Sequence, residues 1–426
     1  MEFTRIIHPV GQGGFYSESL KFGQTEFTVV YDCGGKSKDF MEKYLENYFP
    51  KKEDETKKED KSKKKKNKNT NKYEKQIDAV FISHLHEDHV NGLDFLLNQF
   101  HVRYLFLPQL TKDEILEVFL YNYFLNPESI GNSLLRELYS NNDNLYYLNT
   151  RTRVIKVPHS NEDLSPYNDE ESDSENEISQ IEFDAQRDLD LTEDELNTKI
   201  TILSQGAKLS FKKEWLYIPF NPPVSTNRTI DGIDYASFEE YFKEQLNLRD
   251  FSISDLPSII KKKTISKCRK IYGDYFGPNH HNAYSMTLYS GPVNLNEFNI
   301  FPDRLRKKRT VFYHHCPCLP YGSPYNPNCL YMGDFETKDH FDLLRGFYKH
   351  YWKTIASIQV PHHGSSYNFE QNLYEYPVVG YISVGEDNKY NHPNIDTLIG
   401  IREMMCEPIL VTEKLDTIKI YSAEGS

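Results

Sequence analysis

The chain contains little cysteine and has no long apolar run. Six cysteines occur among 426 residues, which is too few for a disulfide framework. No run of about 18 apolar residues is present, and the N-terminal segment has no apolar core of signal-peptide length. These absences argue against a membrane span and a secretory signal. We therefore expect a soluble, cytoplasmic protein with reduced thiols.

Three of the cysteines lie close together in the sequence. Cys316, Cys318 and Cys329 follow His314 and His315, and a small structural zinc site uses the same residue types. The spacing is not that of a common zinc finger. Reduced, unbound thiols are therefore the favoured interpretation.

A net positive charge is also lacking. The formal charge is -13, so the chain as a whole is not a basic nucleic-acid binder. Two local clusters are nevertheless basic, at residues 261–270 and 303–309. If a polyanion binds, these clusters are its expected contacts. If none binds, they are solvated surfaces.

Two stretches have a composition that cannot support a packed core. Residues 51–75 are rich in lysine and contain no apolar residue before Tyr73, and residues 160–195 are acidic and rich in Ser and Asn. We expect one domain over residues 1–426, with these two stretches as mobile insertions. A protein partner could dock through them, and nothing in the sequence indicates the oligomeric state.

Apolar strand-like segments alternate with helical patterns along the rest of the chain. Strands are expected at residues 76–83 and 102–108, with a helix beginning at Val90 between them. Capping boxes are expected at Thr111 with Glu114 and at Ser237 with Glu240. This alternation is typical of an α/β protein.

The most unusual segment follows the first of these strands. His84, His86, Asp88 and His89 lie within six positions. Alternate residues of an extended segment point the same way, so His84 and His86 can hold one cation together. Asp88 and His89 lie where a helix begins and can serve a second position. Imidazole and carboxylate suit Zn, Mn or Fe. A solvated loop or a set of core histidines is a poor explanation for this density.

Further candidate ligands follow other expected strands. Asp334 comes after the apolar segment 329–332, and His362 and His363 come after the segment 355–360. Taken singly, Asp334 could cap a helix and the two histidines could be surface residues. Together they would complete a two-metal site, in which ions about 3.5–4 Å apart form a clamp for hydrolysis.

These motifs together resemble those of the metallo-β-lactamase-fold hydrolases, and most closely the soluble hydrolase domain of the DNA-uptake protein ComEC. The resemblance implies a four-layer αββα sandwich of two mixed sheets flanked by helices. It does not extend to DNA transport, because the accompanying membrane channel is absent. The motifs that carry it are at residues 10–15, 29–35, 83–92, 282–288, 332–336, 360–366 and 383–393.

The resemblance also implies two divalent metal ions, Zn or Mn, and assigns their ligands. Asp32 would support the metal-binding loops without binding a metal. The first ion would take His84 and His86; the second Asp88, His89 and His362, with His363 as the alternative to His362; Asp334 would bridge the two.

Three positions depart from the family pattern. No third histidine of the first metal site is evident, and the segment from Asn282 to Ser285 stands in its place, with His280 or His281 as further candidates. Gly14 occupies a position where relatives often have Asp, and Asn391 replaces a Gly before His392. The first departure concerns the first metal site and the others concern substrate contacts.

The expected chemistry is hydrolysis by a metal-activated hydroxide, with Asp88 and Asp334 at the metals. His392 would donate a proton to the leaving oxygen or contact a phosphate, and fixing a proline-containing turn is an equally good role for it. Asn282, Ser285 and Ser365 are candidate substrate contacts. Ser365 is not needed as a nucleophile.

Three functions remain open at this point. The first is a phosphodiesterase or nuclease acting on nucleic acid, which the ComEC-like motifs and the basic clusters favour. The second is a hydrolase of a small phosphoester or cyclic ester, which fits the acidic net charge better. The third is a non-catalytic, metal-stabilised binding or sensor module, which the full ligand set disfavours.

Overall fold

The computed structural model describes residues 1–48, 76–125, 152–160, 177–183, 201–223, 228–262, 265–277, 285–294, 298–299 and 327–425. The Lys-rich stretch at 51–75 lies outside the described residues. So do most of the acidic stretch, Asn282 with its neighbouring histidines, the basic cluster at 303–309, and two of the clustered cysteines. Residues Glu177–Phe183 form β7, which pairs with β8. Cys329 is buried in β14.

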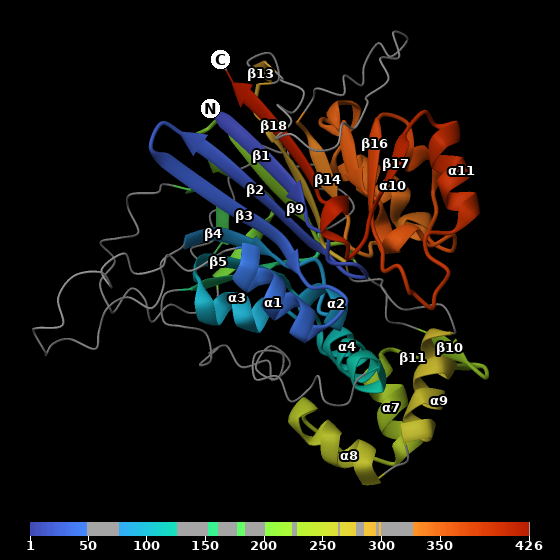
Figure 1. Ribbon diagram of the computed structural model, residues 1–426. Coiled ribbons are helices and arrows are strands. Elements are labelled where there is room, and N and C mark those ends of the chain that lie inside the picture. Colours follow the sequence, from blue (N-terminus) through green and yellow to red (C-terminus); the bar gives the residue numbers. More distant parts are fainter. Residues whose placement is uncertain are drawn as a thin grey trace, which may run out of the picture.

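In the described part of the chain, sixteen strands form one mixed sheet (Figure 1). One half of it runs in the order β13 (Phe298–Asn299), β18 (Lys419–Gly425), β1 (Glu2–Ile7), β2 (Phe15–Phe22), β3 (Thr25–Cys33), β4 (Gln76–Phe81), β5 (His101–Pro108), β6 (Arg153–Val157) and β8 (Thr201–Phe211). The other half continues with β9 (Trp215–Phe220), β12 (Thr287–Pro292), β14 (Cys329–Tyr331), β15 (Ser357–Gln359), β16 (Val379–Ser383) and β17 (Glu407–Val411). A separate hairpin pairs β10 (Arg228–Ile230) with β11 (Ile233–Tyr235).

The expectation of two separate sheets is wrong, because β8 connects the two halves into one sheet. The N-terminal end of this eleven-residue strand pairs with β6, and its C-terminal end pairs with β9. Gly206, between these two ends, has a φ of 71°, a value that glycine adopts without steric cost. Hydrogen bonds therefore continue from one half of the sheet to the other.

The two halves of the sheet face each other across an apolar interior. Phe3 of β1 stacks on Trp215 of β9 with ring centroids 4.2 Å apart, although the two strands are not neighbours in the sheet. Tyr31 of β3 stacks on Tyr331 of β14 at 5.0 Å. These contacts belong to one buried cluster with members on most of the strands. The sheet is thus folded over its own core.

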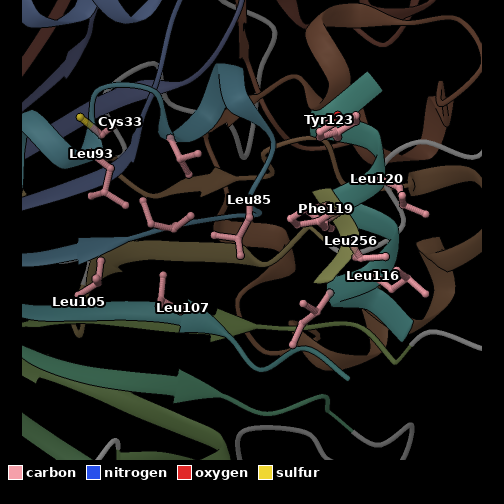
Figure 2. Close-up of a cluster of buried hydrophobic side chains, with 14 of the residues drawn as sticks. Cys33, Leu85, Leu93, Leu105, Leu107, Leu116, Phe119, Leu120, Tyr123 and Leu256 are labelled. Carbon is pink, nitrogen blue, oxygen red and sulfur yellow. The ribbon is translucent and has the colours of Figure 1, made fainter. Parts of the chain in front are cut away.

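Helices cover both outer faces of the folded sheet (Figure 1). One face carries α1 (Lys38–Tyr48), α2 (Glu87–Val90), α3 (Leu93–Gln99) and α4 (Lys112–Leu125), with α7 (Phe238–Leu246), α8 (Leu256–Lys262) and α9 (Ile265–Phe276) packed beyond α4. The other face carries α10 (Thr337–Phe347) and α11 (Ile395–Glu403). Figure 2 shows Leu105 and Leu107 of β5 in the same cluster as Phe119 of α4. Within the described part of the chain, no helix combines the length and the apolar character that a bilayer crossing requires.

The two expected capping boxes have different outcomes. Glu114 N–H donates to Thr111 Oγ1 at 3.3 Å and the Glu114 carboxylate accepts from Thr111 N–H, so the first box is confirmed. Ser237 caps α7 by accepting from Glu240 N–H at 3.1 Å. The Glu240 carboxylate, however, accepts from Ala236 N–H, one residue before the cap.

Candidate metal centre

The site begins where β3 and β4 end side by side. Asp32, at the end of β3, has a φ of 57° and is fully buried. Its carboxylate accepts hydrogen bonds from Ser83 N–H at 2.7 Å, from Ser83 Oγ–H at 2.8 Å and from His89 Nδ1–H at 2.8 Å. Because Nδ1 of His89 is committed to Asp32, Nε2 is the atom that faces the site and would bind a metal ion once its proton is released.

Gly14 allows this close approach. A Cβ at this position would lie 2.9 Å from Asp32 Oδ2 and 3.0 Å from His89 Nδ1, closer than ordinary contacts allow. Gly34 also needs its missing side chain, since a Cβ there would lie 2.1 Å from the carbonyl oxygen of Asp88. The departure from the family pattern at Gly14 therefore leaves the space that the Asp32–His89 pair occupies.

Asp334 reaches the site from the opposite half of the sheet. It follows β14 and Gly333, whose φ is 54°. Its Oδ1 lies 3.3 Å from His89 Nε2 and 3.7 Å from His363 Nε2, and its Oδ2 lies 3.9 Å from His84 Nε2. One carboxylate thus faces three imidazoles.

Of the two adjacent histidines, His363 turns toward this carboxylate. Its Nδ1–H donates to the carbonyl oxygen of Ser383 at 2.8 Å, and its Nε2 lies 3.4 Å from Asp88 Oδ2. His362 has a similar left-handed backbone, but its ring faces His392, with centroids 5.6 Å apart. The structure therefore groups His363 with Asp88 and leaves His362 beside His392.

Within the described part of the chain, two groups of side chains have an arrangement that fits a metal ion. One is His84, His89 and Asp334, and the other is Asp88, His89 and His363, with the ligand atoms of each group within 4.8 Å of one another. The Nε2 atoms of His84, His89 and His363 are buried and have no hydrogen-bond partner among the described residues. Buried polar atoms normally have partners, so these converging lone pairs fit divalent metal ions.

The electrostatics of these groups support the same conclusion. Burial raises the pKa of Asp334, but the charges of His89 and His363 outweigh it and hold the pKa well below its usual value. Burial lowers the pKa of His84, and the neighbouring imidazoles lower it further. Burial also lowers the pKa of His89, but Asp334 and Asp32 together raise it well above normal. A proton on His89 therefore stands where a cation would, and metal binding would release it.

Three other predicted site residues lie around this centre. The His86 ring is 4.6 Å from the His84 ring and stacks on Tyr121 at 4.2 Å, and it is in neither group. Ser285 is fully buried; its Oγ lies 3.2 Å from His84 Nδ1 and accepts from Asp334 N–H at 2.9 Å. Ser285 thus positions two of the candidate ligands, His84 and Asp334. Ser365 instead lines the cavity beside the centre.

The cavity over the centre has a volume of about 520 Å³. Tyr367 and Tyr390 are 48% and 60% exposed among its lining residues. Lys36 is the single lysine or arginine among the described lining residues, and its Nζ lies 2.6 Å from Glu413 Oε1. The full lining is Gln12, Gly35, Lys36, Ser37, His86, Glu87, Asp88, Asn91, Tyr121, Leu125, Asp334, His362, His363, Ser365, Tyr367, Tyr390 and His392.

Sequence reasoning missed Gln359, which fixes the turn that carries Asp334. Its side-chain oxygen accepts from Met332 N–H at 2.7 Å and from Gly333 N–H, and its NH₂ group donates to the Gly333 carbonyl oxygen at 3.0 Å. The sequence did contain a signal for this role. Gln359 is a polar residue within an apolar strand, and it lies two residues before Pro361 and the histidine pair. Tyr121 and Ser83 were missed as well, because each acts only through a contact with a site histidine or its support.

Replacing Gln359 with Leu is expected to weaken metal binding about 10- to 100-fold, the usual effect of losing a group that orients a ligand. The change leaves two buried N–H groups without an acceptor and frees the turn before Asp334. Competition with a chromophoric chelator measures the affinity. Gln371→Leu, at an exposed glutamine, is the control. An affinity equal to that of the parent in Gln359→Leu would rule out this positioning role.

Comparison with known proteins finds one family that matches the segment with the histidine cluster. Residues 22–106, from β2 to β5 and including His84 to His89, match the metallo-beta-lactamase superfamily. No curated protein matches the chain. The match is to the superfamily and does not separate the ComEC-like branch from the others. The chain thus combines a mixed α/β fold, a segment that matches the metallo-β-lactamase superfamily, and His and Asp groups consistent with metal binding.

Proposed function

We propose that this chain, with its metallo-β-lactamase superfamily domain, is a metal-dependent phosphodiesterase that acts on nucleic acid. The observation that carries the proposal is the convergence of three buried imidazole lone pairs and two carboxylates at the floor of a cavity with exposed tyrosines. The floor supplies hydrolytic chemistry and the tyrosines supply a surface for bases.

His84, His89 and Asp334 would hold one divalent ion, with His86 close to it, and Asp88 with His363 would hold a second. Such ions, Zn or Mn, lower the pKa of water and offset charge on phosphoryl oxygens. The protein itself orients the ligands. Asp32 and the carbonyl oxygen of Ser383 each accept the Nδ1 proton of a histidine, which directs Nε2 of His89 and His363 toward the ions.

His392 is best suited to contact a phosphate. Burial lowers its pKa to about 4, with further contributions from the charges of His362 and His363. At neutral pH the imidazole is therefore uncharged. A neutral ring still donates one N–H hydrogen bond to a phosphoryl oxygen, whereas it has little proton to give to a leaving group.

The tyrosines at the cavity mouth favour a substrate with bases. Tyr367 and Tyr390 are largely exposed, and Tyr390 lies nearly parallel to His392, with centroids 6.1 Å apart. Stacking of a base on an aromatic side chain is worth about 1–3 kcal/mol and tolerates any sequence. A cluster of exposed aromatic rings beside a hydrolytic centre is what a nucleic-acid substrate would use.

A second candidate is a hydrolase of a small phosphoester. The limited volume of the cavity and its single, already paired lysine favour this substrate class. The two candidates differ in whether the substrate extends beyond the cavity, so the same protein preparation can distinguish them.

The test offers the protein, loaded with Mn or Zn, two substrates: labelled single-stranded DNA and a small phosphodiester dye. We expect both to be hydrolysed. Tyr390→Ala should raise KM for DNA about 5- to 150-fold, the equivalent of one lost stacking interaction, and leave the dye unaffected. Tyr390→Phe should behave as the parent. Dye turnover without DNA cleavage would support the small phosphoester, and no turnover with metal bound would support a binding or sensor module.

A further inference from the structure

The α4 wall of the cavity continues into a basic helix. Tyr121 and Leu125 line the cavity from the C-terminal part of α4, and Leu125 is 53% exposed. Arg269 of α9 donates a hydrogen bond to the carbonyl oxygen of Phe124, and its guanidinium lies 5.6 Å from the centre of the Phe124 ring. The positive charge of α9 is therefore fixed one residue away from the cavity wall.

Helix α9 turns an apolar side inward and a basic side outward. Cys268 and Tyr272 are buried in the core that α9 shares with α4 and α7. Lys267, Arg269 and Lys270 are exposed in the N-terminal half of the helix, and one exposed acid, Asp274, follows a turn later. Lys267 and Lys270 are three residues apart, so they are neighbours on the helix surface. This part of an otherwise acidic chain can compensate the charge of a polyanion.

Helix α9 is held in place by the elements around it. It packs against α4, α7 and β10 (Figure 1). Its link to the cavity is through α4, where Arg269 bonds to the Phe124 carbonyl oxygen.

Metal ions on the cavity floor would offset the charge of the reactive phosphate, but the described lining offers the flanking phosphates only Lys36, which is paired with Glu413. A nucleic-acid substrate with its reactive phosphate over the metal centre therefore needs cations outside the cavity. Of the exposed cations of α9, Arg269 contacts α4 at Phe124, and Lys267 and Lys270 lie within two residues of it on the same helix.

We propose that Lys267, Arg269 and Lys270 bind the phosphate backbone of a single-stranded nucleic acid on its way into the cavity. The inference rests on the proposed function and adds the path of the substrate. A single strand is required because only unpaired bases can stack on the rim tyrosines while the backbone follows a basic surface.

The test uses the double variant Lys267→Gln with Lys270→Gln and a fluorescent single-stranded DNA. Arg269 is kept because it also bonds to α4. Anisotropy titrations in a chelator, which prevents metal-dependent cleavage, give the binding constant at several salt concentrations. Each lost phosphate contact reduces the slope of log K against log salt by about 0.7 for single strands, so the double variant should lose about 1.4. Lys338→Gln with Lys349→Gln, at exposed lysines near the ends of α10, is the matched control and should keep the parent slope.

Hydrolysis of the small phosphodiester dye separates this inference from the function on which it rests. The dye should be turned over equally by the parent and both double variants, since no part of α9 is needed to bind it. A double variant that binds DNA with the parent slope, or a parent that shows no salt-dependent binding, would overturn the proposal. A parent that binds DNA through α9 but hydrolyses neither substrate would instead contradict the phosphodiesterase function.

Discussion

Asp334→Asn is expected to lower kcat for the phosphodiester dye at least about 10³-fold. Asp334 is the carboxylate that faces His84, His89 and His363, and its replacement removes the negative charge on which these three imidazoles converge. Charge stabilisation by such a centre is worth several kcal/mol, and each 1.36 kcal/mol is a factor of ten in rate. Steady-state kinetics give the rate, and elemental analysis of the same samples gives the metal content.

Asp342→Asn is the control for this change. Asp342 lies on the exposed side of α10, eight residues further along the chain, and should keep the parent rate and metal content. Thermal unfolding of both variants shows whether the fold is intact. Parent-like turnover by a folded Asp334→Asn protein would exclude the proposed centre as the seat of hydrolysis.

Glu18→Gln is expected to lower the free energy of unfolding by about 3–5 kcal/mol, the usual result of removing one member of a buried ion pair. Glu18 of β2 and Arg5 of β1 are each 2% exposed and lie 2.7 Å apart inside the folded sheet. The Glu18 carboxylate also accepts hydrogen bonds from Tyr217, Ser290 and Tyr331 of the facing half. The Glu18 carboxylate therefore links β2 to β9, β12 and β14 in the facing half of the sheet through hydrogen bonds. Urea denaturation provides the measurement.

Two further variants identify the cause. Glu2→Gln removes a member of the exposed Glu2–Lys21 pair, whose side chains are 65% and 51% exposed, and should change the stability by less than about 1 kcal/mol. Arg5→Met combined with Glu18→Leu removes both charges and should recover much of the loss. If the double variant is as unstable as Glu18→Gln, packing and not the unpaired charge is responsible.

The parts of the site that could be predicted are those whose signal is local. His84, His86, Asp88 and His89 follow an apolar strand within a few residues, so their direction is set by the backbone of one turn. Asp334 was predictable for the same reason. The structure brings His84, Asp88 and His89 together with it around the floor of one cavity.

The parts that could not be predicted depend on contacts between distant segments. Gln359 acts on a turn 26 residues earlier. Gly14 matters because a Cβ there would lie too close to Asp32 and His89. Neither role leaves a pattern in the neighbouring residues. The single continuous sheet was missed for a related reason, since it depends on the bend at Gly206 in β8 and on pairing at both ends of that strand.

The sequence by itself determined which donor atoms this protein offers and that each group of them follows a strand. The tertiary structure alone decided which donors meet: it turned His363 inward and His362 toward His392, and it placed His89 between Asp32 and Asp334. The physical reason is that an imidazole or a carboxylate becomes a ligand only when several lone pairs converge within a few ångströms. That convergence is set by the register of strands far apart in the chain, which no local pattern records.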